Sequence, residues 1–261
     1  MSYNQARLRR LNAHRARPTG DYVLYWMQAF RRLGHNHALD YALRCARELQ
    51  KPLVVYEGLR LDYPWASRRL HQFVLEGMQA NAARAQALGL NYWPFVETPE
   101  RPARGLLRLL STRAALVVTD DYPCFVVPEQ AAALARAVEV PVFAVDSSSL
   151  VPLSLLQPVV GAAAHLRPRL HKAFAEAWEH RAAAEPDLDG AAARPVEAPF
   201  PLWMAADVAA FVKGLPLDAS VPAVTATPGG TPAGRERLSA FVKKRLRGYA
   251  AGRSGPCPPE R

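Results

Sequence analysis

Apolar positions along the first 150 residues alternate between two patterns. Short, nearly continuous apolar runs, rich in β-branched and aromatic residues, are separated by longer segments in which apolar residues return every three or four positions. The short runs predict buried strands, and the longer segments predict amphipathic helices. The predicted strands are residues 22–26, 53–56, 91–95, 115–119 and 142–146, and the predicted helices are residues 37–50, 66–88, 101–111 and 128–138.

This alternation predicts the fold class α/β, with a doubly wound, five-stranded parallel sheet covered by helices on both faces. Residues 21–57 show the pattern best, because two apolar runs flank one helical segment. Asn36 is a good N-cap for that helix, and Asp40 lies near the positive end of its dipole. Ligands of such sheets bind where the strands end at their carboxyl edge, so we expect the functional site there.

The pattern changes on either side of this predicted α/β domain, residues 21–150. Residues 1–20 are rich in arginine and poor in apolar side chains, so we expect a basic, disordered tail. Residues 151–232 are rich in proline and predict an interdomain linker rather than core. Within this linker we expect a helix near residues 169–180 and a short helical segment at residues 205–213.

Residues 233–251 predict a final amphipathic helix with a basic side. Its apolar stripe is formed by Leu238, Phe241, Val242, Leu246 and Tyr249. Residues 252–261 have no apolar periodicity, and we expect a second disordered tail there. Since no later segment can cover the stripe, and burying such side chains is worth about 1.5–3 kcal/mol each, we expect that the chain stops short of a further domain.

Composition narrows the class of protein. Half of the 261 residues are hydrophobic, which is enough for a full core, and the formal net charge of +10 favours polyanionic partners such as nucleic acid. The three cysteines are not in CxxC spacing, which suits a reducing compartment. No apolar run approaches the ~20 residues that a membrane-spanning helix needs. We therefore expect a cytoplasmic protein with no membrane partner.

Polar and aromatic residues gather at the predicted strand ends. Trp26, Tyr56, Tyr122 and Phe125 would border one crevice of a doubly wound sheet, which suits a planar ligand. Glu57, Asp120, Asp121 and Asp146 stand at strand ends as well, where carboxylates can bind hydroxyl or ring N–H groups. The same carboxylates can equally cap helices and form turns, and the aromatic residues taken singly can be ordinary core.

Several common motifs are missing from the loop after the first strand. It contains neither GxGxxG nor GxxxxGK[ST], so it predicts neither a Rossmann dinucleotide loop nor a P-loop. There is no GxSxG nucleophile elbow. His35 and His37 could bind a metal ion as imidazole ligands, but no carboxylate or cysteine lies at a matching spacing. This favours an ordinary loop beside a capping asparagine.

An ordered series of short stretches resembles the class II cyclobutane-pyrimidine-dimer DNA photolyases of the photolyase/cryptochrome family. These stretches are Tyr25-Trp26-Met27, Arg32 with Asn36-x-Ala38-Leu39, Asp62-Tyr63-Pro64-Trp65-Ala66-Ser67, Arg69-Leu70-His71, Phe73-Val74-Leu75-Glu76-Gly77-Met78, Val117-Val118-Thr119-Asp120-Asp121-Tyr122-Pro123, Val145-Asp146-Ser147 and Leu166-Arg167-Pro168-Arg169-Leu170-His171. The final helix, ending Arg247-Gly248-Tyr249-Ala250, is similar to the one that enters the family's flavin domain. The resemblance runs from about residue 22 to residue 250.

The resemblance implies a light-driven carbon–carbon lyase that repairs pyrimidine dimers in DNA. The family's N-terminal Rossmann-like α/β domain holds an antenna pigment, a deazaflavin in some members, and its C-terminal helical domain binds FAD and splits the dimer. This chain would retain the antenna domain, with residues 233–251 as the first helix of a truncated flavin domain. No catalytic residue is expected here. Alone, the chain should be inactive, unless a separately encoded flavin domain pairs with it.

For an antenna pigment we predict a site at the carboxyl edge of the sheet. Its predicted residues are Trp26, Met27, Arg32, Asn36, Tyr56, Glu57, Asp121 and Tyr122. Arg32 would pair with an anionic oxygen, the carboxylates would accept ring or ribityl donors, and the aromatic rings would stack on the pigment. Two alternatives remain open: a standalone nucleotide- or flavin-type binding module, and a basic DNA-binding fragment without catalysis.

Overall fold

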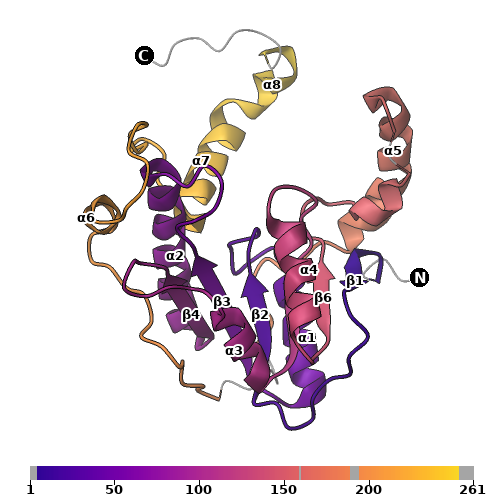
Figure 1. Cartoon of the computed structure of the whole chain (residues 1–261). Helices are drawn as coiled ribbons and strands as arrows, with labels where there is room; N and C mark the ends of the chain where they lie inside the picture. The colour runs from indigo at the N-terminus through magenta and orange to yellow at the C-terminus, as the bar shows by residue number, and fades with distance from the viewer. Residues whose placement is uncertain (1–4, 159, 189–193, 253–261) are drawn as a thin grey trace.

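The computed structural model describes residues 5–158, 160–188 and 194–252 of the chain (Figure 1). At its centre is one six-stranded sheet with the strand order β1-β6-β5-β2-β3-β4. The strands are β1 (Leu8–Arg10), β2 (Tyr22–Met27), β3 (Leu53–Leu59), β4 (Asn91–Val96), β5 (Ala114–Asp120) and β6 (Val142–Val145). The strands from β2 to β6 pair in parallel, as predicted, whereas β1 runs antiparallel to β6.

The prediction of a disordered tail over residues 1–20 is wrong from residue 5 onward. Residues 5–7 form a short 3-10 helix, η1 (Gln5–Arg7), and β1 follows it to add a sixth, antiparallel strand. The segment is fixed by two side chains that hydrogen-bond to backbone far away in the sequence. Arg7 donates to the carbonyls of Asp146, Ser149 and Leu150, and Asn12 donates to those of Ala135 and Val140. Composition could not reveal bonds of this kind.

Helices cover both faces of the sheet, as expected for a doubly wound fold. On one face, α1 (His37–Leu49) and part of α2 (Arg68–Leu88) pack over the side chains of Val23, Tyr25 and Met27. On the other face, α3 (Leu106–Arg113) and α4 (Val127–Ala137) pack over Tyr22 and Leu24. Successive residues of β2 therefore enter opposite halves of the core, because side chains alternate along a strand.

Local signals explain where the first two helices begin and end. The Asn36 side chain accepts the backbone N–H groups of Ala38 and Leu39, which confirms the predicted N-cap of α1. Ser67 caps α2 by accepting the N–H of Leu70, so this helix begins at residue 68 rather than at residue 66. Gly89, with φ of 68°, ends it in the left-handed conformation that glycine adopts without strain.

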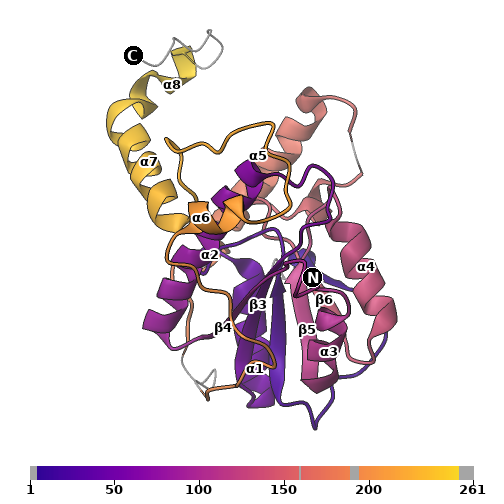
Figure 2. The ribbon, with the colours of Figure 1, turned by 60° about the vertical axis from the view of Figure 1, so that its left-hand side comes forward.

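The proline-rich segment after residue 150 has helices near both predicted positions, residues 169–180 and 205–213, and part of it also packs against the sheet. It contains η2 (Leu153–Leu156), α5 (Ala163–Glu179) and α6 (Val208–Lys213), and Figure 2 shows α6 beside α2. Trp203, Val208 and Val212 are buried in a third core cluster with side chains of β3, α2 and β4. The backbone N–H of Trp203 also donates to the carbonyl of Pro94, at 2.9 Å, so part of the segment forms core at the β4 side of the sheet.

The end of the described chain is a pair of helices rather than the single helix predicted for residues 233–251. α7 (Thr231–Lys244) and α8 (Leu246–Gly252) are separated at Arg245, whose backbone leaves the helical conformation. Most of the predicted apolar stripe is exposed: Leu238 by 60%, Val242 and Leu246 by 49% each, and Tyr249 by 52%. Both α5 and α7 project from the carboxyl edge of the sheet (Figure 1). Except for Gly252, the predicted tail 252–261 lies outside the described residues.

A search of the described helices for a long apolar stretch of membrane-spanning type finds none.

Candidate functional site at the carboxyl edge of the sheet

The loop after β2 is held in place by a buried carboxylate at the end of β5. Asp120 is 1% exposed, and its Oδ2 accepts the backbone N–H groups of Gln28, Ala29 and Phe30 at 2.9, 2.7 and 2.9 Å. Its Oδ1 accepts the hydroxyl of Tyr25 at 2.8 Å. Burial raises the pKa of Asp120 although these four donors favour the ionised form. Asp120 therefore fixes the loop and offers no free oxygen to a ligand.

A second buried carboxylate, at the end of β3, is also fully used by protein partners. Glu57 is 0% exposed; Arg31 pairs with its Oε1 at 2.9 Å, and Asn81 and Tyr92 donate to its Oε2 at 3.0 and 2.6 Å. Burial, followed by the charge of Glu57, raises the pKa of Tyr92 well above its usual value. This network joins the loop after β2 to α2 and β4. Sequence reasoning missed Arg31, because nothing in the pattern distinguishes it from Arg32.

Four further residues of the predicted pigment site lie within or just below the surface. Met27 is fully buried, and Asn36 and Tyr56 are 1% and 4% exposed. Asn36 caps α1 and donates to the Tyr25 hydroxyl, and Trp26 is partly buried against the core on the other face of the sheet. These side chains pack in the core or hold the loop after β2, and they do not form an open binding surface.

Two of the last three predicted residues, Arg32 and Tyr122, lie against the same ring. Both contact Phe30: the Tyr122 ring lies edge-on to it with centroids 6.1 Å apart, and the Arg32 guanidinium lies 5.5 Å from its centroid. Arg32 also donates to the carbonyl of His35 at 3.1 Å. Tyr122 is 37% exposed, so a ligand can reach this group. The structure thus brings a cation and a reachable ring together, as the predicted site requires.

The same strand edge also carries an exposed pair of rings from two separate loops. Trp65, after β3, and Phe125, after β5, stack with centroids 5.8 Å apart and planes 20° apart. Trp65 is 79% exposed and Phe125 is 48% exposed, and both residues have left-handed backbone conformations, with φ of 64° and 62°. Non-glycine residues rarely adopt this conformation, and it often marks a functional loop. We call Phe30, Tyr63, Trp65, Tyr122 and Phe125 the edge aromatic group.

The edge aromatic group extends inward. Tyr63 contacts Phe125 edge-on at 6.2 Å and stacks on His71 at 5.4 Å. His71 is fully buried, and its two ring nitrogens lie 3.0 and 3.1 Å from the carbonyl oxygens of Arg60 and Ser67. Burial lowers the pKa of His71. A continuous series of rings therefore runs from the interior to the exposed Trp65, and residues of two distant loops form it, which is why sequence spacing could not predict it.

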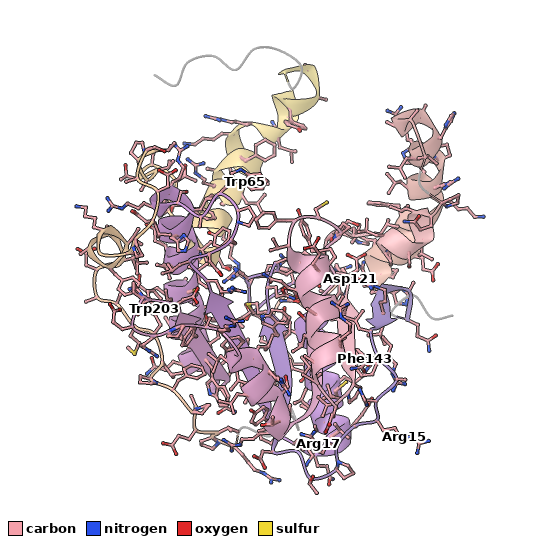
Figure 3. All side chains as sticks on the ribbon, in the orientation of Figure 1. Arg15, Arg17, Trp65, Asp121, Phe143 and Trp203 are labelled. Atoms are coloured by element: carbon pink, nitrogen blue, oxygen red, sulfur yellow. The ribbon has the colours of Figure 1, made fainter. Side chains whose placement is uncertain are left out.

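The remaining predicted residue, Asp121, lies at a different part of the edge. It forms a bidentate ion pair with Arg9 of β1, with N–O distances of 3.0 and 2.6 Å. This pair lines a cavity of about 570 Å³ between β1, the ends of β5 and β6, and η2. Figure 3 shows Asp121 near α4 and Trp65 near α7. The carboxyl edge thus has two candidate binding regions, the edge aromatic group and this cavity.

Within the described ranges, no group of three or more histidine, cysteine, aspartate and glutamate side chains is placed to hold a metal ion.

Parts of this chain are similar to known proteins in sequence and in structure. No family model matches the chain. A curated deoxyribodipyrimidine photo-lyase from Methanothermobacter thermautotrophicus is 35% identical over 147 residues, which are 56% of this chain and 32% of that protein. Over these residues the chain is homologous to that photo-lyase. It spans about a third of the length of this curated relative.

The chain also has the fold of part of a solved photolyase. A bacterial class III photolyase from Agrobacterium tumefaciens matches it with a TM-score of 0.59 and 19% sequence identity, over 93% of this chain and 48% of that one. The comparison bears out the predicted α/β fold, that of the photolyase N-terminal Rossmann-like domain. The sheet differs from the prediction in having six strands, one of them antiparallel.

Proposed function

We propose that this chain is the light-harvesting α/β part of a photolyase-type DNA repair protein of class II. The homology to a deoxyribodipyrimidine photo-lyase carries the proposal, because an enzyme of that name acts on pyrimidine dimers in DNA. A planar pigment such as a deazaflavin would absorb light at the carboxyl edge and pass the energy to a flavin. The chain itself would bind the pigment and perform no bond cleavage.

The edge aromatic group supports a planar pigment in particular. Trp65 and Phe125 present exposed ring faces, and a flat ligand gains about 0.5–1.5 kcal/mol per stacked ring beyond the area that it buries. Arg32, beside Phe30, would pair with an anionic oxygen of the pigment, and Tyr122 would contact its edge. Of the eight residues predicted from sequence, we assign direct contact to Arg32 and Tyr122.

The other predicted residues take supporting parts in this proposal. Asn36 and Glu57, with Arg31, hold the loop after β2 that carries Phe30 and Arg32. Met27 packs in the core on the α1 side of the sheet, and Trp26 and Tyr56 pack on the opposite side, so we assign these three to core packing. Asp121 lies with Arg9 at the separate cavity and is not assigned to the pigment.

We assign FAD and the splitting of the dimer to a helical domain of the kind found in longer family members. None of the described side chains is assigned to FAD. A separately encoded flavin domain is the partner that this assignment implies, and the exposed stripe of α7 and α8 supports it, because four half-exposed apolar side chains offer a helix-packing surface.

Titration with a deazaflavin tests the proposal. We expect binding, seen as a change in deazaflavin fluorescence, to weaken about tenfold in Trp65→Ala and in Phe125→Ala, since each loses one stacked ring and its buried area. The matched control is Phe174→Ala, which removes a 52%-exposed ring from α5. Absence of any fluorescence change in the wild-type protein would remove the pigment assignment, and an equal loss in the control would move the site away from this edge.

A basic DNA-binding fragment is the second candidate, and the charge of the last two helices favours it. Lys243, Lys244, Arg245 and Arg247 are all exposed. Such a fragment should bind irradiated and intact DNA alike, with an affinity that falls steeply as salt rises. A preference for irradiated DNA would argue against this second candidate.

A further inference from the structure

The cavity at the β1 side of the sheet is not used by the proposed pigment site. It lies where β5 and β6 end, and residues of η1, β1, η2 and the start of α5 line it. Its volume of about 570 Å³ falls in the range of small-molecule sites. Ligands of open α/β sheets bind outside the carboxyl ends of the strands, so both its position and its size are those of a binding site.

Most of the cavity wall is apolar. The apolar side chains are those of Ala6, Leu8, Pro123, Leu153, Leu156, Val160 and Leu166. The wall also holds two cations and two carboxylates, Arg7, Arg9, Asp121 and Asp146, so that its charges balance. A ligand must therefore be largely apolar, and a net charge on it would meet no excess of opposite charge.

The four charged side chains of the cavity differ in whether a ligand can hydrogen-bond to them. Arg7 is 3% exposed and donates to backbone carbonyls of the loop after β6, and the two oxygens of Asp146 accept the N–H groups of Ser148 and Leu153, both at 2.8 Å. Arg7 and Asp146 therefore hold the backbone that forms the cavity wall. The side chains of Arg9 and Asp121 are hydrogen-bonded to each other, and they are 55% and 25% exposed. A ligand in the cavity can therefore contact this ion pair.

We propose that the cavity binds an uncharged, mostly apolar small molecule that carries one carboxamide-type group. The guanidinium of Arg9 donates to the amide oxygen, and the carboxylate of Asp121 accepts the amide N–H. An ion pair seen from one side presents a donor beside an acceptor, which is the complement of an amide. This cavity is separate from the edge aromatic group, and ligand binding in it does not require a pigment at the edge aromatic group.

Three matched compounds test the chemistry on the full chain. 2-Naphthamide, 2-naphthoate and 2-methylnaphthalene share one apolar ring system and differ in an amide, an anion and a methyl group. Ligand-observed saturation-transfer NMR titrations should show 2-naphthamide binding about tenfold more tightly than either of the others, because hydrogen bonds to charged groups are worth about that much. Equal affinities, or a preference for 2-naphthoate, would overturn the proposal.

Three variants test where 2-naphthamide binds. Leu156→Trp fills the cavity and should weaken 2-naphthamide binding at least about tenfold, whereas Leu155→Trp, on the same turn but outside the lining, should leave it unchanged. The double variant Arg9→Met with Asp121→Leu removes the ion pair without leaving a lone charge. It should still bind 2-methylnaphthalene and should lose the preference for the amide.

These variants also separate the cavity from other apolar surfaces. If 2-naphthamide bound on the exposed stripe of α7 and α8, Leu156→Trp would bind it as well as the wild type does, and the proposal would fail. The thermal midpoints of the two tryptophan variants, measured alongside, show whether both are folded.

Discussion

At the scale of single residues, two neighbouring aspartates at the end of β5 have opposite surroundings. Asp120 is buried beneath four hydrogen-bond donors, whereas Asp121 reaches outward to Arg9. The carboxylates of adjacent strand residues point to opposite sides, so one holds the loop after β2 while the other lines the cavity.

Replacing each aspartate by alanine should separate these roles. Asp120→Ala leaves three backbone N–H groups and the Tyr25 hydroxyl without their acceptor, which should cost about 3 kcal/mol or more of unfolding free energy. Asp121→Ala loses a half-exposed ion pair and should cost less than about 1 kcal/mol. Urea denaturation of the two variants measures both values. Similar costs at the two positions would contradict this assignment.

The first turn of α1 contains two groups whose titrations oppose each other. Burial, with the charges of Arg7 and Arg32, lowers the pKa of His37 from 6.5 to about 4. Burial raises the pKa of Asp40 from 3.8 to about 6. The stability from His37 is present above pH 6.5 and is lost as the pH falls toward 4, whereas that from Asp40 is present below pH 3.8 and is lost as the pH rises toward 6.

Single substitutions should separate the contributions of His37 and Asp40 to the pH dependence of the unfolding free energy. In Asp40→Asn the His37 component remains, so the unfolding free energy should rise more steeply than in the wild type between about pH 4 and 6.5. In His37→Gln the Asp40 component remains, so the change across the same interval should shift in the opposite direction. Guanidinium denaturation in a series of buffers gives the slopes. Parallel profiles for all three proteins would show that neither group is linked to folding.

At the scale of elements, the short strand β1 is held in part by the arginine that precedes it. β1 pairs with β6 over only three residues, and a strand this short does not hold itself. Arg7 fastens it, because its side chain binds carbonyls of the loop after β6 and its own carbonyl accepts the N–H of Asp146 at 2.9 Å. The edge strand and one wall of the cavity therefore form together.

Arg7→Ala should release β1. We expect a loss of about 2 kcal/mol or more of unfolding free energy, since buried carbonyls lose a charged donor. Hydrogen exchange at the amide of Asp146 should become faster. Arg15→Ala is the matched control, because Arg15 is exposed and lies beyond the end of β1. Unchanged protection of Asp146 in Arg7→Ala would show that backbone pairing alone holds the strand.

At the scale of the whole molecule, the helices that project from the carboxyl edge expose large apolar side chains. Besides the stripe on α7 and α8, α5 exposes Phe174 and Trp178, each by 52%. Helices with such faces associate with other apolar surfaces. The opposite edge, where the strands begin, is closed by loops (Figure 1).

Without a partner, this surface should cause self-association. At tens of micromolar, the wild-type protein should sediment as a mixture of monomer and larger species, whereas Leu238→Gln with Val242→Gln should shift the mixture toward monomer. Ser239→Gln with Lys243→Gln, on the polar side of the same helix, should leave the distribution unchanged. Sedimentation velocity provides the measurement, and a wild-type protein that is fully monomeric would contradict the expectation.

The sequence by itself determined the central architecture. The apolar runs of β2, β3, β4, β5 and β6 and the helical periodicity between them are local properties, and they predicted the parallel sheet with helices on both faces. The caps at Asn36 and Gly89 were equally predictable, because a cap is a bond between residues two to four positions apart. The homology to photolyases agrees with the family resemblance read from ordered motifs.

Only the tertiary structure decided which side chains at the carboxyl edge are available. Glu57 and Asp121 look alike in sequence, yet one is enclosed by Arg31, Asn81 and Tyr92 and the other faces a cavity. The stacking of Trp65 on Phe125 and the pairing of Arg9 with Asp121 join residues 60 and 112 positions apart. Such contacts arise from chain packing in three dimensions, and no period along the sequence encodes them.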